Sequence, residues 1–272
     1  MSEENNHNNY HDNNFNLNEA PGYALLLQVR AASFDYAVVN DGRLLLYVQN
    51  TAIDELANPK YLKSLLSANY KKVVVGLPVS GLTLIPNSLY SDAHAAGYAR
   101  FLDVGEDEKV LVQPLDSENK IIYKTSTGII STVEKFGLQN AVYIAKGWIK
   151  AIADSYPTND KLFLELGDQN VHFLHFLSGK LRFYNTFEFK NPDELLYFTA
   201  LVCEELNLNN QDVNLFLSGN VSSGDAQMNR LKDFYPKVEL NDLRVVELPD
   251  RVAPHKMLPL VALSLCESSE EL

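Results

Sequence analysis

Short apolar segments separated by turn residues dominate the chain after its first 20 residues. Segments near 24–30, 33–39 and 44–49 are rich in Leu, Val and Tyr, which favour β-strands. Asn40-Asp41-Gly42 joins the last two segments, and Asp-Gly between apolar segments is a strong signal of a β-hairpin. A helical stretch follows, and then KKVVVGLP has the pattern of a buried strand bounded by Gly and Pro. The pattern predicts three antiparallel strands, a helix and a strand that returns to the sheet.

The middle of the chain carries a second group of elements. A helix is predicted over 88–101, with apolar residues on one face: Leu89, Ala93, Ala96 and Phe101. Two apolar segments near 110–124, separated by a polar turn, predict a strand pair inserted into this part of the chain. We expect this pair to be a place where a partner docks. A helix that buries Trp148 ends at Pro157.

The order of elements starts again at Lys161. The second group comprises strands at 161–166, 170–177 and 180–189, a helix from Pro192 to Leu206, the strand VNLFLSG, a helix near 224–234, strands near 237–247 and a terminal helix from about His255 to Glu267. Gly42 and Gly179, in the two hairpin turns, lie 137 residues apart, and so do Gln28 and Glu165 at the ends of the first strands. This constant spacing predicts a structural duplication.

Two such groups in tandem define the expected fold class. Three antiparallel strands followed by a helix and a returning strand describe a ribonuclease H-like lobe, and two such lobes describe the actin-like ATPase architecture. The sequence therefore predicts an α/β protein with mixed sheets flanked by helices. The expected domains are an Asn-rich disordered tail over 1–20, a first lobe over 21–157 with the insertion near 110–124, and a second lobe over 158–272.

Composition restricts the partners and the compartment. The formal net charge of -12 and the absence of a Lys/Arg cluster argue against a nucleic-acid partner. No apolar run approaches the roughly 20 residues of a membrane span, so we expect no membrane insertion. The N-terminus lacks the basic start and apolar stretch of a signal peptide, which favours a cytoplasmic protein. Cys203 and Cys266 have no metal-ligand spacing and are expected to be buried thiols.

Three separated blocks carry a resemblance to a known family. They are LTLIPNSLYSDAHAAGYARFL, NTFEFKNPDELLYFTALVCEELNLNNQDVNLFLSGNV and the terminal LPLVALSLCE. The chain resembles the Bacteroidetes family catalogued as domain of unknown function 3822. The resemblance implies an actin-like or ribonuclease H-like fold without an established activity, and it supplies no catalytic residues.

The candidate ligand cleft lies where the first strand of each lobe ends. Actin-like ATPases carry an Asp-x-Gly turn there in each lobe, whose backbone amides hold phosphate while the acid positions the metal or its water. The first lobe has Gln28 and Arg30 in these places, and neither replaces the acid or the glycine. The second lobe keeps an acid and a glycine in Glu165 and Gly167, followed by Asp168. The first-lobe turn therefore keeps neither feature of Asp-x-Gly, and the second-lobe turn keeps the glycine with a longer acid.

The adenosine end of such a cleft needs a glycine turn after the fourth strand of the second lobe. Ser218-Gly219-Asn220 occupies that place, and it either admits a ligand or simply links strand to helix. If nucleotide binds there without hydrolysis, Arg30 is placed to pair with its phosphates.

Other chemistry has weaker support. A nuclease needs several carboxylates on two metal ions, and Glu204 or Glu205 would have to join Glu165 and Asp168, although both fit the solvated face of a helix. His172 and His175 lie three residues apart on a strand and therefore point to opposite faces, so we expect one packed and one exposed histidine and no metal site.

These patterns lead to two hypotheses. The first is a non-enzymatic actin-like protein with a degenerate nucleotide cleft, without cofactor, that acts through a protein partner or by self-association. The second is a nucleotide-binding switch that takes ATP with Mg²⁺ and hydrolyses it weakly or not at all.

Overall fold

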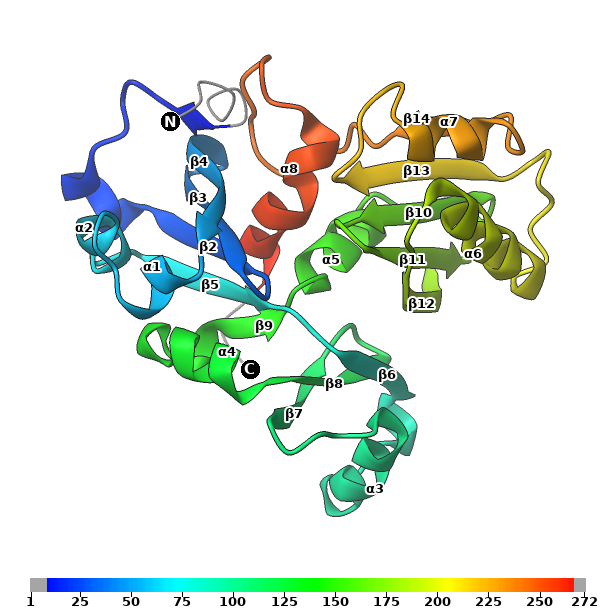
Figure 1. The fold of residues 1–272 in the computed structure, drawn as a ribbon, viewed down its shortest axis with the longest axis horizontal. Coiled ribbons are helices and arrows are strands. Elements are labelled where there is room, and N and C mark those ends of the chain that lie inside the picture. Colours follow the sequence, from blue (N-terminus) through cyan, green and yellow to red (C-terminus); the bar gives the residue numbers. More distant parts are fainter. Residues whose placement is uncertain (1–8, 267–272) are drawn as a thin grey trace. The chain divides into compact units, whose positions relative to one another are not determined.

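The computed structural model describes residues 9–266, which form two compact units (Figure 1). Unit 1 comprises Met1–Gly147 and Leu260–Leu272, and unit 2 comprises Trp148–Pro259. The bounds differ from the lobes expected at 21–157 and 158–272, because the chain returns to unit 1 at its C-terminal end. Each unit has its own sheet and its own buried core.

A six-stranded mixed sheet forms the centre of unit 1. Its order is β1-β4-β3-β2-β5-β9, in which β2, β5 and β9 are parallel and the other neighbours are antiparallel. The strands are β1 (Tyr10–His11), β2 (Ala24–Val29), β3 (Ser33–Asn40), β4 (Arg43–Ala52), β5 (Lys72–Leu77) and β9 (Ala141–Tyr143). The continuous apolar sequence of β2 and β5 fits central strands that are covered on both faces.

Short helices accompany this sheet. They are η2 (Leu17–Gly22), α1 (Asp54–Ala57), α2 (Lys63–Leu66), α4 (Thr127–Val133), η6 (Glu134–Phe136), η7 (Leu138–Asn140) and η8 (Ala262–Leu265). Leu56 of α1, Leu66 of α2 and Val133 of α4 are buried against the sheet strands in one cluster. The helical stretch expected between the hairpin and β5 is therefore two single turns, α1 and α2.

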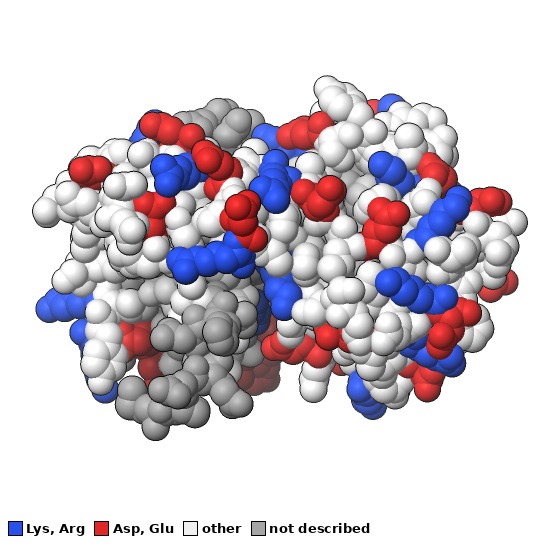
Figure 2. Space-filling model, turned by 90° about the horizontal axis from the view of Figure 1, so that it is seen from above, with Lys and Arg blue, Asp and Glu red and all other residues white. Residues whose placement is uncertain are grey.

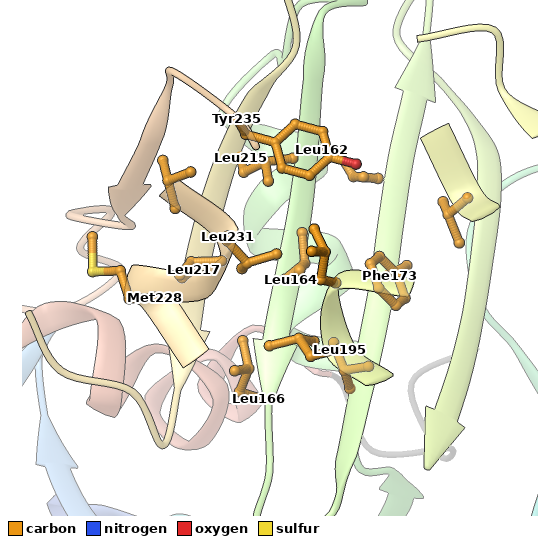
Figure 3. Close-up of a cluster of buried hydrophobic side chains, with 14 of the residues drawn as sticks. Leu162, Leu164, Leu166, Phe173, Leu195, Leu215, Leu217, Met228, Leu231 and Tyr235 are labelled. Atoms are coloured by element: carbon orange, nitrogen blue, oxygen red, sulfur yellow. The ribbon is translucent and has the colours of Figure 1, made fainter. Parts of the chain in front are cut away.

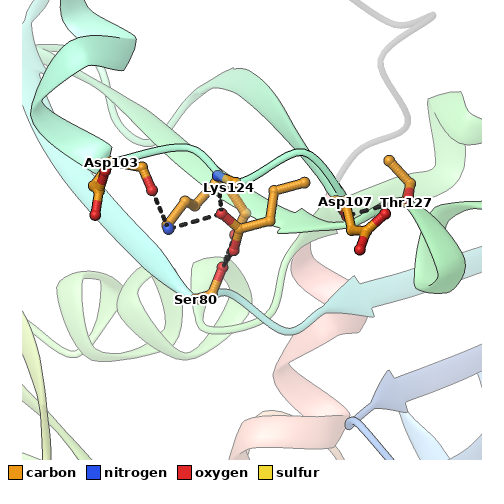
Figure 4. A network of polar contacts seen from close by, with 7 residues as sticks. Ser80, Asp103, Asp107, Lys124 and Thr127 are labelled. Atoms are coloured by element: carbon orange, nitrogen blue, oxygen red, sulfur yellow. Dashed lines mark hydrogen bonds and ion pairs between the residues drawn. The ribbon is translucent and has the colours of Figure 1, made fainter.

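The strand pair expected near 110–124 is part of a three-stranded antiparallel sheet in unit 1. Its order is β6-β8-β7, with β6 (Gly81–Pro86), β7 (Glu108–Pro114) and β8 (Asn119–Ser126). Lys124 on β8 binds Glu108 on β7 at 2.8 Å and the Asp103 carbonyl at 2.9 Å, and Glu108 also accepts a hydrogen bond from Ser80 (Figure 4). The hydrogen bond from Lys124, and to a smaller extent that from Ser80, lowers the pKa of Glu108 to about 2. This polar network ties the strand pair to the segment that leaves β5.

The helix expected over 88–101 is broken in the structure. The segment forms η3 (Asn87–Leu89), η4 (Asp92–His94), α3 (Ala95–Ala99) and η5 (Arg100–Leu102). Leu89 is 69% exposed and Phe101 is 82% exposed, so the face that was expected to be buried is not. The apolar spacing predicted a covered face, but no element of the described chain covers it.

Unit 2 repeats the five-stranded part of the unit 1 sheet. Its order is β12-β11-β10-β13-β14, with β10 (Lys161–Leu166), β11 (Asn170–Leu177), β12 (Lys180–Glu188), β13 (Asn214–Gly219) and β14 (Val238–Leu240). The helices are α5 (Lys146–Asp154), α6 (Pro192–Glu205), α7 (Ala226–Lys232) and α8 (Pro254–Val261), of which α5 and α8 cross the boundaries between the units. Leu164 and Leu217 from the sheet pack with Leu195 of α6 and Leu231 of α7 (Figure 3).

The duplication predicted from the 137-residue spacing is present strand by strand. β2, β3 and β4 begin 137 residues before β10, β11 and β12, and all pairings have the same direction. Even a β-bulge recurs, between Val38 and Val39 in unit 1 and between His175 and Phe176 in unit 2. A bulge at the same position in both sheets is a feature of the shared fold and not a local defect.

The disordered tail expected over 1–20 is wrong for residues 9–20. Tyr10 and His11 form β1 against β4, and Asp12 is buried. Asp12 accepts hydrogen bonds from the Tyr10 hydroxyl at 2.9 Å and from Arg43 at 2.7 Å. The polar composition did not reveal this ion pair, because the partner of Asp12 lies 31 residues away. The first eight residues lie outside the described chain.

Candidate functional site

The unit 1 half of the candidate site is filled by an ion pair. Arg30 follows β2, and its guanidinium binds both oxygens of Asp35 on β3, at 2.9 and 2.6 Å. Asp35 is 3% exposed and also accepts a hydrogen bond from the Asn50 amide at 2.8 Å. The backbone amide of Arg30 donates to the Ser33 carbonyl at 2.8 Å. A bidentate pair and a bonded amide therefore stand where an Asp-x-Gly turn would hold phosphate.

Gln28 lies two residues earlier, inside β2. It is buried, and its neighbours in the sheet are Asp35 on β3 and Gly76 on β5. Its amide side chain has no negative charge with which to hold a metal ion or to activate water. The unit 1 turn thus has neither the acid nor the glycine of an Asp-x-Gly turn.

The unit 2 half contains a row of buried polar side chains across three strands. Glu165 on β10 lies opposite His172 on β11, and its carboxylate is 3.7 Å from the imidazole Nε2. His172 also contacts the Tyr184 hydroxyl through Nδ1 at 2.8 Å and the Asn170 amide nitrogen through Nε2 at 3.2 Å. Burial lowers the pKa of His172 to about 4, which makes the ring neutral at pH 7.

The expectation of one packed and one exposed histidine is wrong. His172 and His175 are both buried, and His175 contacts the Lys161 carbonyl through Nδ1 at 2.9 Å. The strand alternation was right to place them on different faces, but both faces of β11 are covered. Among the described residues, no group of three His, Cys, Asp or Glu side chains could hold a metal ion.

The turn after β10 is closed by its own hydrogen bonds. The Gly167 amide donates to the Asn170 carbonyl at 2.8 Å, the equivalent of the Arg30 bond in unit 1. The exposed Asp168 accepts a hydrogen bond from the Asn220 side chain at 3.0 Å. This contact joins the turn after β10 to the turn after β13.

The turn after β13 lies directly against the end of β10. Gly219 has a φ of 84°, and a Cβ atom at this position would overlap the Leu166 carbonyl oxygen. The Asn220 amide donates to that same oxygen at 2.7 Å. Ser218 lies beside Glu165 in the parallel pairing, is fully buried, and its Oγ has no hydrogen-bond partner among the described residues.

The structure therefore brings six of the eight predicted residues together at one end of the unit 2 sheet. They are Glu165, Gly167, Asp168, Ser218, Gly219 and Asn220. Gln28 and Arg30 lie together at the corresponding end of the unit 1 sheet. Glu204 and Glu205, which the nuclease hypothesis requires, are both exposed on α6.

Two features escaped the sequence interpretation. One is Asp35, which the 137-residue spacing places at the position of His172; an acid within the apolar run SFDYAVV was the available signal. The other is a groove of about 890 Å³ between α6 and α7, lined by residues that include Tyr197, Arg230 and Phe234. Tyr197 on α6 is 62% exposed and Phe234, just after α7, is 48% exposed, and no sequence pattern indicated that they line one groove.

Charged side chains of both signs are interspersed on the face seen in Figure 2, and no Lys/Arg patch dominates it. This distribution is unlike a nucleic-acid footprint, which needs clustered positive charge. None of the helices in the described part of the chain is long and apolar enough to cross a membrane.

Two solved structures have the same fold. One is a Bacteroides thetaiotaomicron protein with an actin-like ATPase fold and unknown function, at 20% identity and a TM-score of 0.74, over 93% of this chain and 99% of the other. The other is a chain of the PilM–PilN type IV pilus biogenesis complex, at 14% identity and a TM-score of 0.56, over 89% and 96%. No curated protein matches the chain in sequence.

These similarities establish the actin-like ATPase fold, as the two tandem ribonuclease H-like lobes predicted. The family model described as "Protein of unknown function (DUF3822)" matches residues 12–238, and the chain therefore belongs to this family, as its sequence blocks indicated.

Proposed function

We propose that this chain is a non-catalytic, cytoplasmic actin-like protein that acts by binding a protein partner. The observation that carries the proposal is the bidentate Arg30–Asp35 pair at the end of β2. Asp35 neutralises the guanidinium that a phosphate would need, and it adds a negative charge that repels phosphate. Arg30 is therefore a poor phosphate ligand, in contrast to the role considered for it in a nucleotide-binding cleft.

The state of the backbone amides supports the same proposal. A phosphate-binding turn presents unpaired N–H groups to its ligand. Here the amides of Arg30, Gly167 and Asn220 all donate to backbone carbonyls, at 2.8, 2.8 and 2.7 Å. A phosphate would have to break these bonds, which lowers any affinity for nucleotide.

The fold is compatible with a role in an assembly. The PilM–PilN structure contains a chain of the same fold in a type IV pilus biogenesis complex with another protein. We carry over from it only that an actin-like fold serves in a complex, and not the identity of a partner.

Phosphate release and calorimetry with MgATP test the proposal. We expect no turnover and no binding at micromolar concentrations for the full-length protein. Turnover that is lost in Glu165→Gln but kept in Glu204→Gln would contradict it, since Glu204 is an exposed carboxylate on α6 and controls for a change of surface charge.

The alternative is a nucleotide-binding switch, and one observation favours it. The buried Ser218 Oγ lacks a partner in the described chain and lies beside the Gly219 turn, where a ligand could supply the missing hydrogen bond. In that case ATP raises the melting temperature, Ser218→Ala reduces the rise, and Ser223→Ala at the exposed neighbouring site does not. A panel of nucleotides without any shift would exclude this function.

A further inference from the structure

The two duplicated sheets differ at the outer edge of their hairpins. In unit 1, β1 pairs with the outer edge of β4, with Tyr10 opposite Tyr47 and His11 opposite Leu46. The Asp12 amide continues this pairing with a 2.8 Å hydrogen bond to the Leu45 carbonyl. In unit 2 the equivalent strand, β12, is the last of its sheet (Figure 1), and no described strand pairs with its outer edge.

The repeated bulge identifies the equivalent positions. Leu45 is the residue that the unit 1 bulge leaves without a partner on β3, and Arg182 is the residue that the unit 2 bulge leaves without a partner on β11. The Leu45 carbonyl accepts the hydrogen bond from the added segment, so the bulge does not prevent an added strand. By the same register, the backbone of Arg182 presents the corresponding acceptor on β12.

The basic residue at the start of β4 also has a counterpart at the start of β12. Arg43, at the start of β4, binds Asp12 of the added segment at 2.7 Å. The residue 137 positions later is Lys180, and Lys180 and Arg182 are both exposed. The start of the β12 edge is therefore basic in a chain whose formal net charge is -12, whereas the exposed Glu188 ends the strand.

One side chain limits how far an added strand could extend. The Thr186 amide donates to the Asn185 side-chain oxygen at 2.8 Å. In unit 1 the amide 137 positions earlier, Gln49, donates to Asn9 of the added segment at 3.2 Å. The Asn185 side chain thus occupies the outward amide of Thr186, whereas in unit 1 the added segment occupies the equivalent amide of Gln49. An added strand can therefore pair only with the part of β12 before Asn185.

We propose that the outer edge of β12 binds an extended acidic segment of a partner protein as an added antiparallel strand. Backbone pairing would supply the affinity, and acids opposite Lys180 and Arg182 the selectivity. Pairing of β12 with β12 of a second copy is disfavoured, because an antiparallel pair confined to the part before Asn185 would bring Lys180 and Arg182 of both copies together. This inference rests on the proposed partner-binding function and identifies the outer edge of β12 as the surface that binds the partner.

A labelled peptide with the sequence of residues 3–14, EENNHNNYHDNN, is a suitable probe, because it is acidic and contains Tyr10–Asp12, which lie along β4. Fluorescence anisotropy with the full-length protein should show binding that weakens roughly threefold or more in Arg182→Glu. Lys232→Glu, with the same charge change at an exposed position of α7, should bind as the wild type does. Asn185→Ala should bind more tightly, since it releases the Thr186 amide for pairing.

Hydrogen exchange locates the peptide. We expect slower exchange of the amides at 181–184 when it binds. Absence of binding, an equal loss in Lys232→Glu, or protection at 45–47 on β4 instead would overturn the inference. So would a concentration-dependent dimer that Arg182→Glu abolishes, which would make a second copy the occupant. Because nucleotide is not involved, these results would leave the tests of a non-catalytic function unaffected.

Discussion

Asp35 and His172 occupy the same position of the two duplicated sheets, and their chemistry follows from the residue after each first strand. Where Arg30 replaces the glycine, the strand opposite supplies a carboxylate that binds it. Where Gly167 is kept, the equivalent strand carries a neutral histidine, and Asn170 approaches the glycine closely. A buried charge needs a partner, so the buried Asp35 depends on Arg30 in unit 1.

His172 should make the stability of the protein depend on pH. Burial lowers its pKa from 6.5 to about 4 in spite of the Glu165 carboxylate nearby. The unfolded chain therefore takes up a proton that the folded chain does not, and stability is lost as the pH falls from about 6.5 towards 4. We expect the contribution of His172 to make the free energy of unfolding roughly 2 kcal/mol lower at pH 5 than at pH 7.5.

Urea denaturation at the two pH values measures this contribution. His172→Gln should shrink the difference, whereas His11→Gln, at an exposed position, should leave it as in the wild type. A residual slope is expected in His172→Gln, because burial also lowers the pKa of His255. An unchanged difference in His172→Gln would show that the buried imidazole does not govern the acid response.

At the scale of elements, most strands could be predicted, but β1, β6 and several helices could not. Strand bounds follow from local apolar runs and turn residues, so the hairpin turns at Gly42 and Gly179 fixed the register of both sheets. β1 could not be predicted, because the ion pair of the buried Asp12 with Arg43 is formed only in the folded chain. The turns after β2 and β10 follow from the local sequence, while the Arg30–Asp35 pair beside the first of them was missed because it too is formed only in the folded chain.

Gly219 is the element-scale position least able to accept a side chain. Gly219→Ala forces a positive φ on alanine and places its Cβ against the Leu166 carbonyl oxygen. Gly224 has a similar φ of 90°, but a Cβ atom at this position would have no neighbour within 4 Å, so Gly224→Ala isolates the cost of the backbone conformation. We expect about 1–2 kcal/mol for Gly224→Ala and roughly 1–3 kcal/mol more for Gly219→Ala.

Thermal and urea unfolding of the two variants measure this difference. It matters for any ligand assay, because a bulky residue at Gly219 would disrupt the joint between β10 and β13 whether or not nucleotide binds. Equal destabilisation by the two substitutions would mean that the turn after β13 moves away from Leu166 at little cost.

At the scale of the whole molecule, the chain leaves unit 1 after Gly147 and returns to it at Leu260. The apolar sequence of the C-terminal helix predicted burial but could not say against which unit. In the structure, the segment after Leu260 packs closely against other residues of unit 1. A Cβ atom on Gly147 would overlap the Ala262 carbonyl oxygen, and one on Gly76 would lie 3.3 Å from a Leu263 methyl. The second lobe is therefore shorter than the sequence predicted, and the first is completed by the end of the chain.

This arrangement predicts that a substitution near the C-terminus acts on the N-terminal unit. Leu263 is fully buried, so Leu263→Ala should cost about 2–5 kcal/mol. Hydrogen exchange should speed up in β2 and β5 of unit 1, while β10 and β13 of unit 2 exchange as in the wild type. Leu201→Ala, at a side chain that is 43% exposed on α6, is the matched control and should change neither. Faster exchange confined to β10 and β13 would assign the C-terminal segment to the second lobe, and equal acceleration in both sheets would mean that the two units unfold together.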